Sequence, residues 1–224
     1  MTRGILLAGN ESALSAAVAV EASKRVEYFT AAFIPNRLVN PDSKPLPTAA
    51  PLISLHWNPG SPVSARTLIL AAENRLEHIN EAILICVPPT VRKPPGALTA
   101  PEIEIMVNDH IKGWFFLVKE LSALFRLKKT GTLALVLSEL DSGGKEEPPD
   151  IMGLSAVESF RAFTQSLLQS SLEEPFRILG FSAPQSCNTA EFAAFIFKNL
   201  EDGAKRNNNK WLKFGKGRGL FGRY

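Results

Sequence analysis

The sequence predicts an α/β domain in which helices cover both faces of one doubly wound parallel sheet. Short apolar segments alternate with amphipathic segments along almost the whole chain, a pattern typical of strand–helix–strand units with right-handed crossovers. Residues 81–87 (EAILICV) are apolar after the first residue, as expected of a strand buried on both faces. The 224 residues are 45% hydrophobic, which is enough to form one domain with a complete core.

The first half of the chain is expected to supply four strands and two helices. An apolar strand at residues 3–8 ends at Gly9, and a polar turn precedes a helix that begins at Ala13. The other elements expected in this half are strands at 30–39, 51–57 and 81–87, a helix at 62–78 and a proline-rich loop at 40–51.

The second half is organised around a long helix at residues 101–127. Thr99 and Glu102 have the spacing of a capping box at its start, and Gly131 follows its end. The remaining expected elements are strands at 132–137, 176–182 and 210–214, helices at 155–172 and 189–200, the latter capped by Thr189, and a polar loop at 141–149. We therefore predict one domain over residues 1–214 and a basic tail rich in glycine and arginine over 215–224.

Composition excludes several classes of protein. The net charge of +3 is too small to indicate nucleic-acid binding, and no apolar run approaches the roughly 20 residues that span a bilayer. Cys86 and Cys187 are the only cysteines, so we expect a reducing, cytoplasmic setting. The three histidines show no metal-ligand spacing, and we predict no metal site.

The order of elements resembles the short-chain dehydrogenase/reductase family over roughly residues 3–215. The segments that carry the resemblance are ENRLEHINEAILICVPP, LTAPEIEIMVNDHIKGWFFLVKEL, GTLALVLSEL and FRILGFSAP. The resemblance implies a Rossmann-like sheet, an NAD(P) cofactor and an oxidoreductase activity. It also implies dimers or tetramers that pair through the long central helix and the helix after it.

The family's catalytic residues are largely missing from the matching positions. The resemblance places its tyrosine at Gly153 and its lysine at Val157, and neither side chain exchanges a proton. Its helix-kink asparagine falls on His110, while its serine falls on Ser138, which is retained. Tyr28 and Tyr224 are the only tyrosines, so a shift of register does not restore the pair.

The cofactor turn is also altered. The family's glycine-rich turn matches Gly9, Ala13 and Ser15, so only the first glycine is kept. Its Asn-Asn-Ala-Gly segment after the fourth strand has become Cys86-Val87-Pro88-Pro89. If a cofactor binds at all, we expect NAD(P), with residues 9, 13 and 15 at its pyrophosphate.

Three functions follow as hypotheses. The first is a degenerate relative of the short-chain dehydrogenases that serves as a binding or assembly subunit. The second is an oxidoreductase with a rearranged site, in which His110 acts as a base for Ser138. The third is an interaction module that uses the basic tail. In each case we expect a homo-oligomer formed through residues 101–127 and 155–172, where four aromatic residues exceed what one sheet contact needs: Trp114, Phe115, Phe160 and Phe163.

Overall fold

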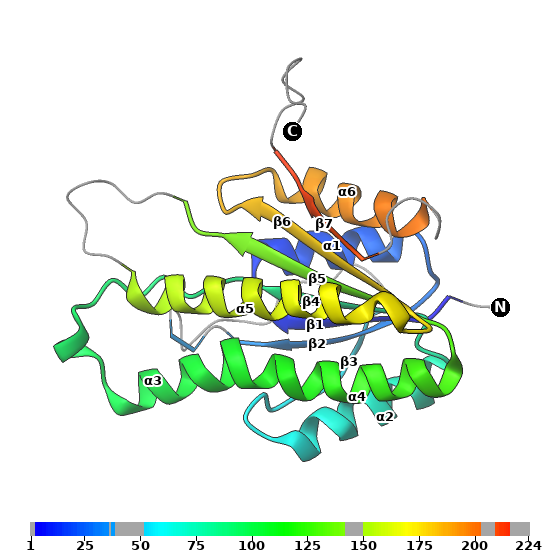
Figure 1. The fold of residues 1–224 in the computed structure, drawn as a ribbon, viewed down its shortest axis with the longest axis horizontal. Coiled ribbons are helices and arrows are strands. Elements are labelled where there is room, and N and C mark those ends of the chain that lie inside the picture. Colours follow the sequence, from blue (N-terminus) through cyan, green and yellow to red (C-terminus); the bar gives the residue numbers. More distant parts are fainter. Residues whose placement is uncertain (1–2, 36, 39–51, 142–149, 203–208, 216–224) are drawn as a thin grey trace.

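The sheet is parallel throughout and has the order β3-β2-β1-β4-β5-β6-β7 in the part of the chain that is described. The computed structural model describes residues 3–35, 37–38, 52–141, 150–202 and 209–215. The strands are β1 (Ile5–Asn10), β2 (Phe29–Ile34), β3 (Leu52–Ser54), β4 (Glu81–Cys86), β5 (Thr132–Glu139), β6 (Arg177–Pro184) and β7 (Lys210–Lys213). The predicted doubly wound α/β fold is confirmed (Figure 1).

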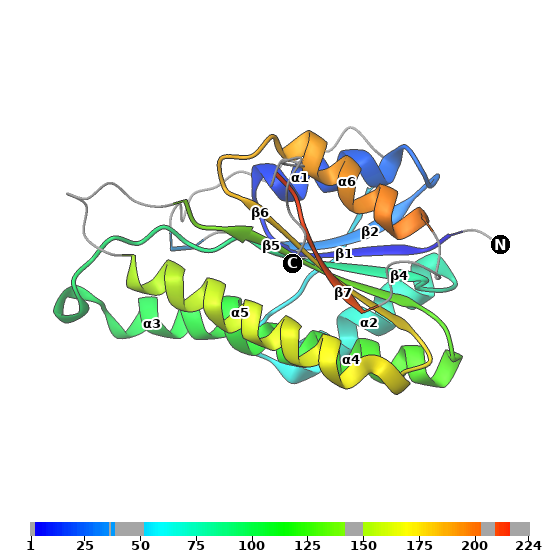
Figure 2. The ribbon, with the colours of Figure 1, turned by 45° about the horizontal axis from the view of Figure 1, so that its top comes forward.

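Helices cover both faces of this sheet. One face packs against α2 (Pro62–Leu76), α4 (Gly113–Lys128) and α5 (Ile151–Ser170), and the other against α1 (Ala13–Ser23) and α6 (Thr189–Glu201). Figure 2 shows the two layers of helices on opposite sides of the strands. Alternate residues of β4 and β5 join opposite cores, because successive side chains of a strand point to opposite faces.

The predicted long helix is two α-helices joined by a π turn. The first, α3 (Ala100–Val107), begins with the predicted capping box between Thr99 and Glu102. The π turn, η2 (Asn108–Lys112), leads into α4. A π turn adds one residue to a turn of helix and often marks a functional position. Here the turn buries Asp109 and His110 against the protein.

One predicted helix start and one predicted helix cap were wrong. Helix α5 begins at Ile151 and not at residue 155, because Asp150 caps it by accepting a hydrogen bond from the Gly153 amide at 2.8 Å. Helix α6 is capped by Asn188 and not by Thr189, since the Asn188 carboxamide oxygen accepts the amide of Ala190 at 3.0 Å.

The predicted strands needed smaller corrections. Strand β1 extends to Asn10 instead of ending at residue 8, β2 ends at Ile34, and β3 has three residues. The predicted loops at 40–51 and 141–149 lie outside the described residues except for Asp141, as does the basic tail after Gly215. None of the described helices is long and apolar enough to cross a bilayer.

Candidate active site at the carboxyl end of the sheet

A ligand site in this architecture is expected beyond the carboxyl ends of β1 and β4. Parallel α/β sheets bind ligands where the strand order reverses, and the order here reverses between β1 and β4. The segments that follow β1, β2, β4 and β5 therefore decide what this edge of the sheet can do.

The turn after β1 is closed by its own hydrogen bonds. The Ser12 hydroxyl accepts the Ser15 amide at 3.0 Å and caps α1. The Ser15 side chain is fully buried, and its hydroxyl donates to the Asn10 carbonyl at 2.6 Å. The amide and the hydroxyl of Ser15 are therefore already hydrogen-bonded within the turn.

Gly9 is required by the packing of β1 on β4. A Cβ atom at this position would lie 2.2 Å from the carbonyl oxygen of Ile85, which belongs to β4. The only glycine that survives from the family's turn therefore has a role that needs no cofactor.

An ion pair links the end of β2 to the π turn. Arg37 donates to both carboxylate oxygens of Asp109, at 2.7 and 2.9 Å. Asp109 is 1% exposed, whereas the Arg37 side chain is half-exposed. Burial raises the pKa of Asp109 above its usual value, and the hydrogen bonds and charge of Arg37 oppose that rise.

An Arg37→Gln variant is expected to lose about 1–2 kcal/mol of stability at pH 7, because it leaves the buried Asp109 carboxylate without a countercharge. The loss is expected to shrink in acid. Since the pKa of Asp109 in the folded protein is already raised and rises further without Arg37, the carboxyl becomes neutral as pH falls and no longer needs the cation. Urea unfolding at several pH values measures this. Arg66→Gln, at an exposed position on α2, is the control, and equal, pH-independent losses in both variants would contradict the assignment.

Apolar side chains fill the space between the loop after β4 and α5. A separate core cluster joins Val91 of that loop, Met106 of α3 and Met152 and Ala156 of α5, with Leu38 packed against it. Asp150 fixes the arrangement, since one carboxylate oxygen accepts the Val91 amide at 3.2 Å and the other accepts the Gly153 amide. This side of the carboxyl edge is therefore packed like a core.

Gly153 and Val157 leave no proton-transfer pair on α5. A Cβ atom at Gly153 would lie 2.6 Å from both the Asp150 carboxylate and the Pro89 carbonyl, so the backbone there has no room for a side chain. Val157 is 2% exposed and belongs to the core between the sheet and α4.

No hydrogen bond joins Ser138 to His110 in the described part of the chain, and packing places the two side chains differently. Ser138 follows Ala134 and Val136 on β5, whose side chains pack under α1 and α6; it shares their face because side chains alternate along a strand. His110 lies on the opposite face and lines a void of about 10 Å³ with Phe160 and Phe163 of α5. Burial lowers the pKa of His110 to about 4, and its Nδ1 atom has no hydrogen-bond partner within the described part of the chain.

Comparison with known proteins gives the fold a name. No family model and no curated protein matches the sequence. Among solved structures, levodione reductase superposes with a TM-score of 0.74 at 14% identity, covering 95% of each chain. A short chain dehydrogenase from Mycobacterium smegmatis gives 0.76 at 13% identity, covering 97% of this chain and 93% of that one. The NADH-dependent reductase A1-R', complexed with NAD, gives 0.74 at 11% identity over 95% of each chain.

The chain has the short-chain dehydrogenase/reductase fold. At these identities the likeness concerns the fold alone, so the cofactor must be tested on the residues present. A dinucleotide in this fold needs open glycines at the turn and free amides at the helix N-terminus. Ser12 occupies one of those amides, and the Ser15 side chain stands at a glycine position. The described residues at this turn do not fit a pyrophosphate held in the usual way.

Two features of this short-chain dehydrogenase fold were missed by the sequence analysis. The Asp150 clamp had a local signal, since an aspartate directly before an apolar segment is a common helix cap. The Arg37–Asp109 pair had none, because 72 residues separate its members.

Among the described residues, no group of three His, Cys, Asp or Glu side chains is placed to hold a metal ion. Cys86 is buried, and burial raises the pKa of its thiol, so it is not a reactive group.

Proposed function

We propose that this chain is a non-enzymatic protein built on the short-chain dehydrogenase/reductase fold, acting as a binding or assembly subunit. The observation that carries the proposal is the core-like packing at the carboxyl edge, where Val91, Met106, Met152 and Ala156 form one apolar cluster. The absence of space at Gly153 supports it, since proton transfer requires a titratable side chain within hydrogen-bond reach of the substrate.

The proposal predicts that NADH and NADPH do not bind at physiological concentrations. Isothermal titration with up to millimolar NAD(H) and NADP(H) is expected to give no saturable heat, and the protein is expected to show no nicotinamide-dependent turnover of carbonyl or alcohol panels. A short-chain reductase that binds NAD serves as the positive control. Saturable binding with a micromolar Kd, or turnover with either cofactor, would overturn the proposal.

The second candidate is an NAD(P)-dependent oxidoreductase with a rearranged site. The solved structures favour it, since reductases and dehydrogenases superpose over nearly the whole chain and one of them is complexed with NAD. The lack of a hydrogen bond between His110 and Ser138 among the described residues counts against the particular arrangement that the sequence suggested. The interaction module on the basic tail stays a prediction, because residues 216–224 lie outside the described part of the chain.

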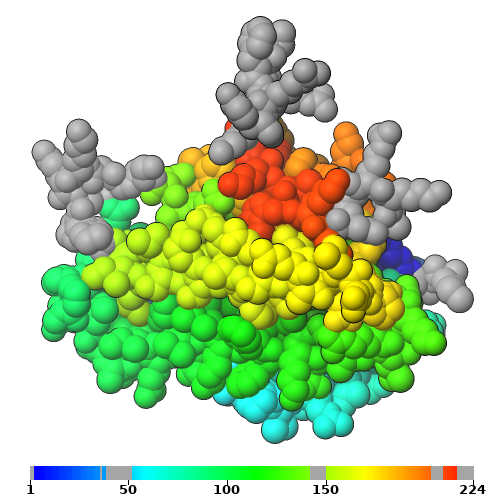
Figure 3. All heavy atoms as spheres, viewed as in Figure 1, coloured from blue at the N-terminus to red at the C-terminus, as the bar shows by residue number. Residues whose placement is uncertain are grey.

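We propose that the subunit pairs with a second copy through α4 and α5. Figure 3 shows these two helices, green and yellow, side by side across one face of the molecule. The Phe115 side chain is 54% exposed, and its ring lies 4.4 Å from that of Phe163 across the two helices. The prediction that Trp114 and Phe160 belong to this surplus was wrong: both are 1% exposed and pack edge to face in the core.

A Phe115→Glu variant is expected to be monomeric. It places a charge at the centre of the proposed contact. The free energy needed to desolvate an unpaired carboxylate there exceeds the free energy that the contact contributes. Sedimentation velocity at micromolar concentration should show the 24.4 kDa species for this variant and a larger species for the wild type. Leu70→Glu on α2, at an equally exposed apolar position (56%), should leave the larger species intact. A monomeric wild type would refute the pairing.

A further inference from the structure

The amino end of the sheet, opposite to the candidate active site, carries a group of arginines and glutamates. Most of these arginines are paired. Arg3 binds Glu81 at 3.0 and 2.8 Å, Arg25 binds Glu201 at 2.6 Å, and Arg126 binds Glu174 through both nitrogens of its fork.

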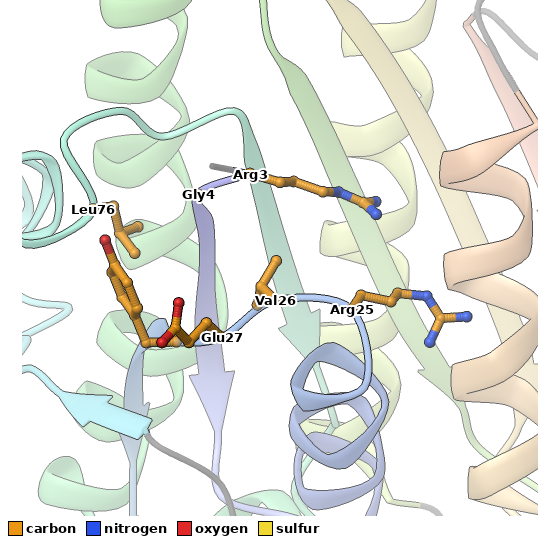
Figure 4. A pocket seen from close by; sticks show the side chains of 7 residues that line it. Arg3, Gly4, Arg25, Val26, Glu27 and Leu76 are labelled. Carbon is orange, nitrogen blue, oxygen red and sulfur yellow. The ribbon is translucent and has the colours of Figure 1, made fainter. Parts of the chain in front are cut away.

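Two cavities open at this end. They differ in whether the arginines that line them are bound to carboxylates. The first, of about 290 Å³, is lined by Arg3, Arg25 and Glu27 among others. Figure 4 shows the Arg3 and Arg25 side chains extending in the same direction, toward α6, where both bind Glu201. Both lining arginines of this cavity are therefore already bound to carboxylates.

The second cavity, of about 510 Å³, is lined by an arginine that has no salt bridge to a carboxylate among the described residues. Arg177 lines it at the start of β6. One terminal nitrogen of Arg177 donates to the Leu200 carbonyl at 3.3 Å. The other terminal nitrogen and Nε are shielded from solvent and have no hydrogen-bond partner among the described residues. Burial lowers the pKa of the Arg177 guanidinium, and the nearby charge of Glu81 partly restores it.

The carboxylates around this cavity are already engaged elsewhere. Glu81 and Glu174 both line it, but their oxygens receive the guanidinium groups of Arg3 and Arg126. A buried guanidinium without a carboxylate or a full set of acceptors is costly. Two nitrogens of Arg177 therefore lack a hydrogen-bond acceptor among the described residues, and they lie beside an open, polar cavity.

Other donors line the same cavity. The Asn80 side-chain oxygen accepts the Gly4 amide at 2.8 Å, which leaves the amide nitrogen of that side chain as a donor. No hydrogen bond within the described part of the chain uses the hydroxyl of Thr130 or Thr132. Arg177, Asn80 and these two threonines all line this cavity, and their side chains carry a guanidinium, an amide and two hydroxyls.

We propose that this cavity binds a small carboxylate, held by the guanidinium of Arg177 with Asn80, Thr130 and Thr132 as further donors. A guanidinium fork matches a carboxylate through two parallel hydrogen bonds. A singly charged ligand suits the site better than a phosphate dianion, because Arg177 supplies one positive charge and Glu81 and Glu174 lie close by. Because these nitrogens are shielded, the proposal requires the guanidinium to rotate toward the cavity when the ligand binds.

The test is a titration of the full-length chain followed by the backbone amide resonances of Gly131, Thr132 and Arg177. The probes are acetate, benzoate and inorganic phosphate, each compared with chloride at equal ionic strength. For the wild type we expect saturable shifts of these amides at millimolar acetate or benzoate. Arg177→Gln is expected to weaken the binding at least tenfold. Arg75→Gln, at an exposed arginine near the end of α2, removes the same charge and should bind like the wild type.

Three outcomes would overturn the proposal. One is the lack of saturable shifts with either carboxylate in the wild type, and another is equal shifts in Arg177→Gln. The third is saturation by phosphate alone, which would replace the carboxylate with a phosphate ligand. If Arg177→Gln does not fold, Arg177→Lys keeps the charge without the fork, and it should bind several-fold more weakly than the wild type. Because this cavity is far along the strands from the Gly9 turn, none of these results depends on whether the chain binds a nucleotide.

Discussion

A Gly9→Ala variant is expected to be severely destabilised with no cofactor present. The added Cβ atom would lie 2.2 Å from the Ile85 carbonyl oxygen, and both residues belong to paired central strands. Neither strand can move away without disturbing a ladder that is buried on both faces. We expect a loss of more than about 4 kcal/mol, which lowers Tm by about 10 °C or more in a chain of this size. Thermal unfolding followed by circular dichroism measures the effect.

The matched control for this variant is Gly96→Ala. A Cβ atom at Gly96 would meet nothing within 4 Å, so its Tm is expected to stay within about 2 °C of the wild type. A Gly9→Ala protein as stable as the control would contradict the packing role. It would instead favour the role that glycines have in dinucleotide-binding turns, where they allow the backbone to approach a pyrophosphate.

The fold was predictable because its signals are local. Strands β4 and β5 each contain five consecutive apolar residues, and the capping box at Thr99 fixes the start of α3. The start of α5 was missed because Gly153 counts against a helix in any local reading. Only the Asp150 cap and the approach of Pro89 explain why a glycine stands there.

The candidate site was less predictable because its contacts join distant parts of the chain. The sequence shows that Gly153 and Val157 cannot transfer a proton, but it does not show what fills the space around them. The packing of Val91 on Met152 and the pairing of Arg37 with Asp109 arise only when the segments after β2 and β4 meet the π turn and α5 at one edge of the sheet. The same holds for Arg177. The sequence does not show that the neighbouring glutamates, Glu81 and Glu174, bind other arginines and leave Arg177 without a bonded carboxylate among the described residues.

The burial of His110 predicts a loss of stability in acid. Its pKa in the folded protein is about 4, while an imidazole in the unfolded chain has a pKa of about 6.5. As pH falls below about 6.5, the unfolded state binds a proton at His110 that the folded state does not bind, so the free energy of unfolding decreases. The decrease ends near pH 4, where the folded protein also takes up the proton. A difference of this size corresponds to about 3 kcal/mol.

Removing the imidazole should remove this part of the pH dependence. Urea unfolding of His110→Asn, between pH 7 and pH 4, is expected to give a flatter profile than the wild type, whatever its absolute stability. His78→Gln deletes an exposed imidazole and is the control for losing one histidine. Proton NMR of the His110 ring supplies a direct measurement, with a midpoint expected near pH 4. A midpoint near 6.5 would mean that the π turn opens to solvent, and that the void beside Phe160 and Phe163 admits water and its proton.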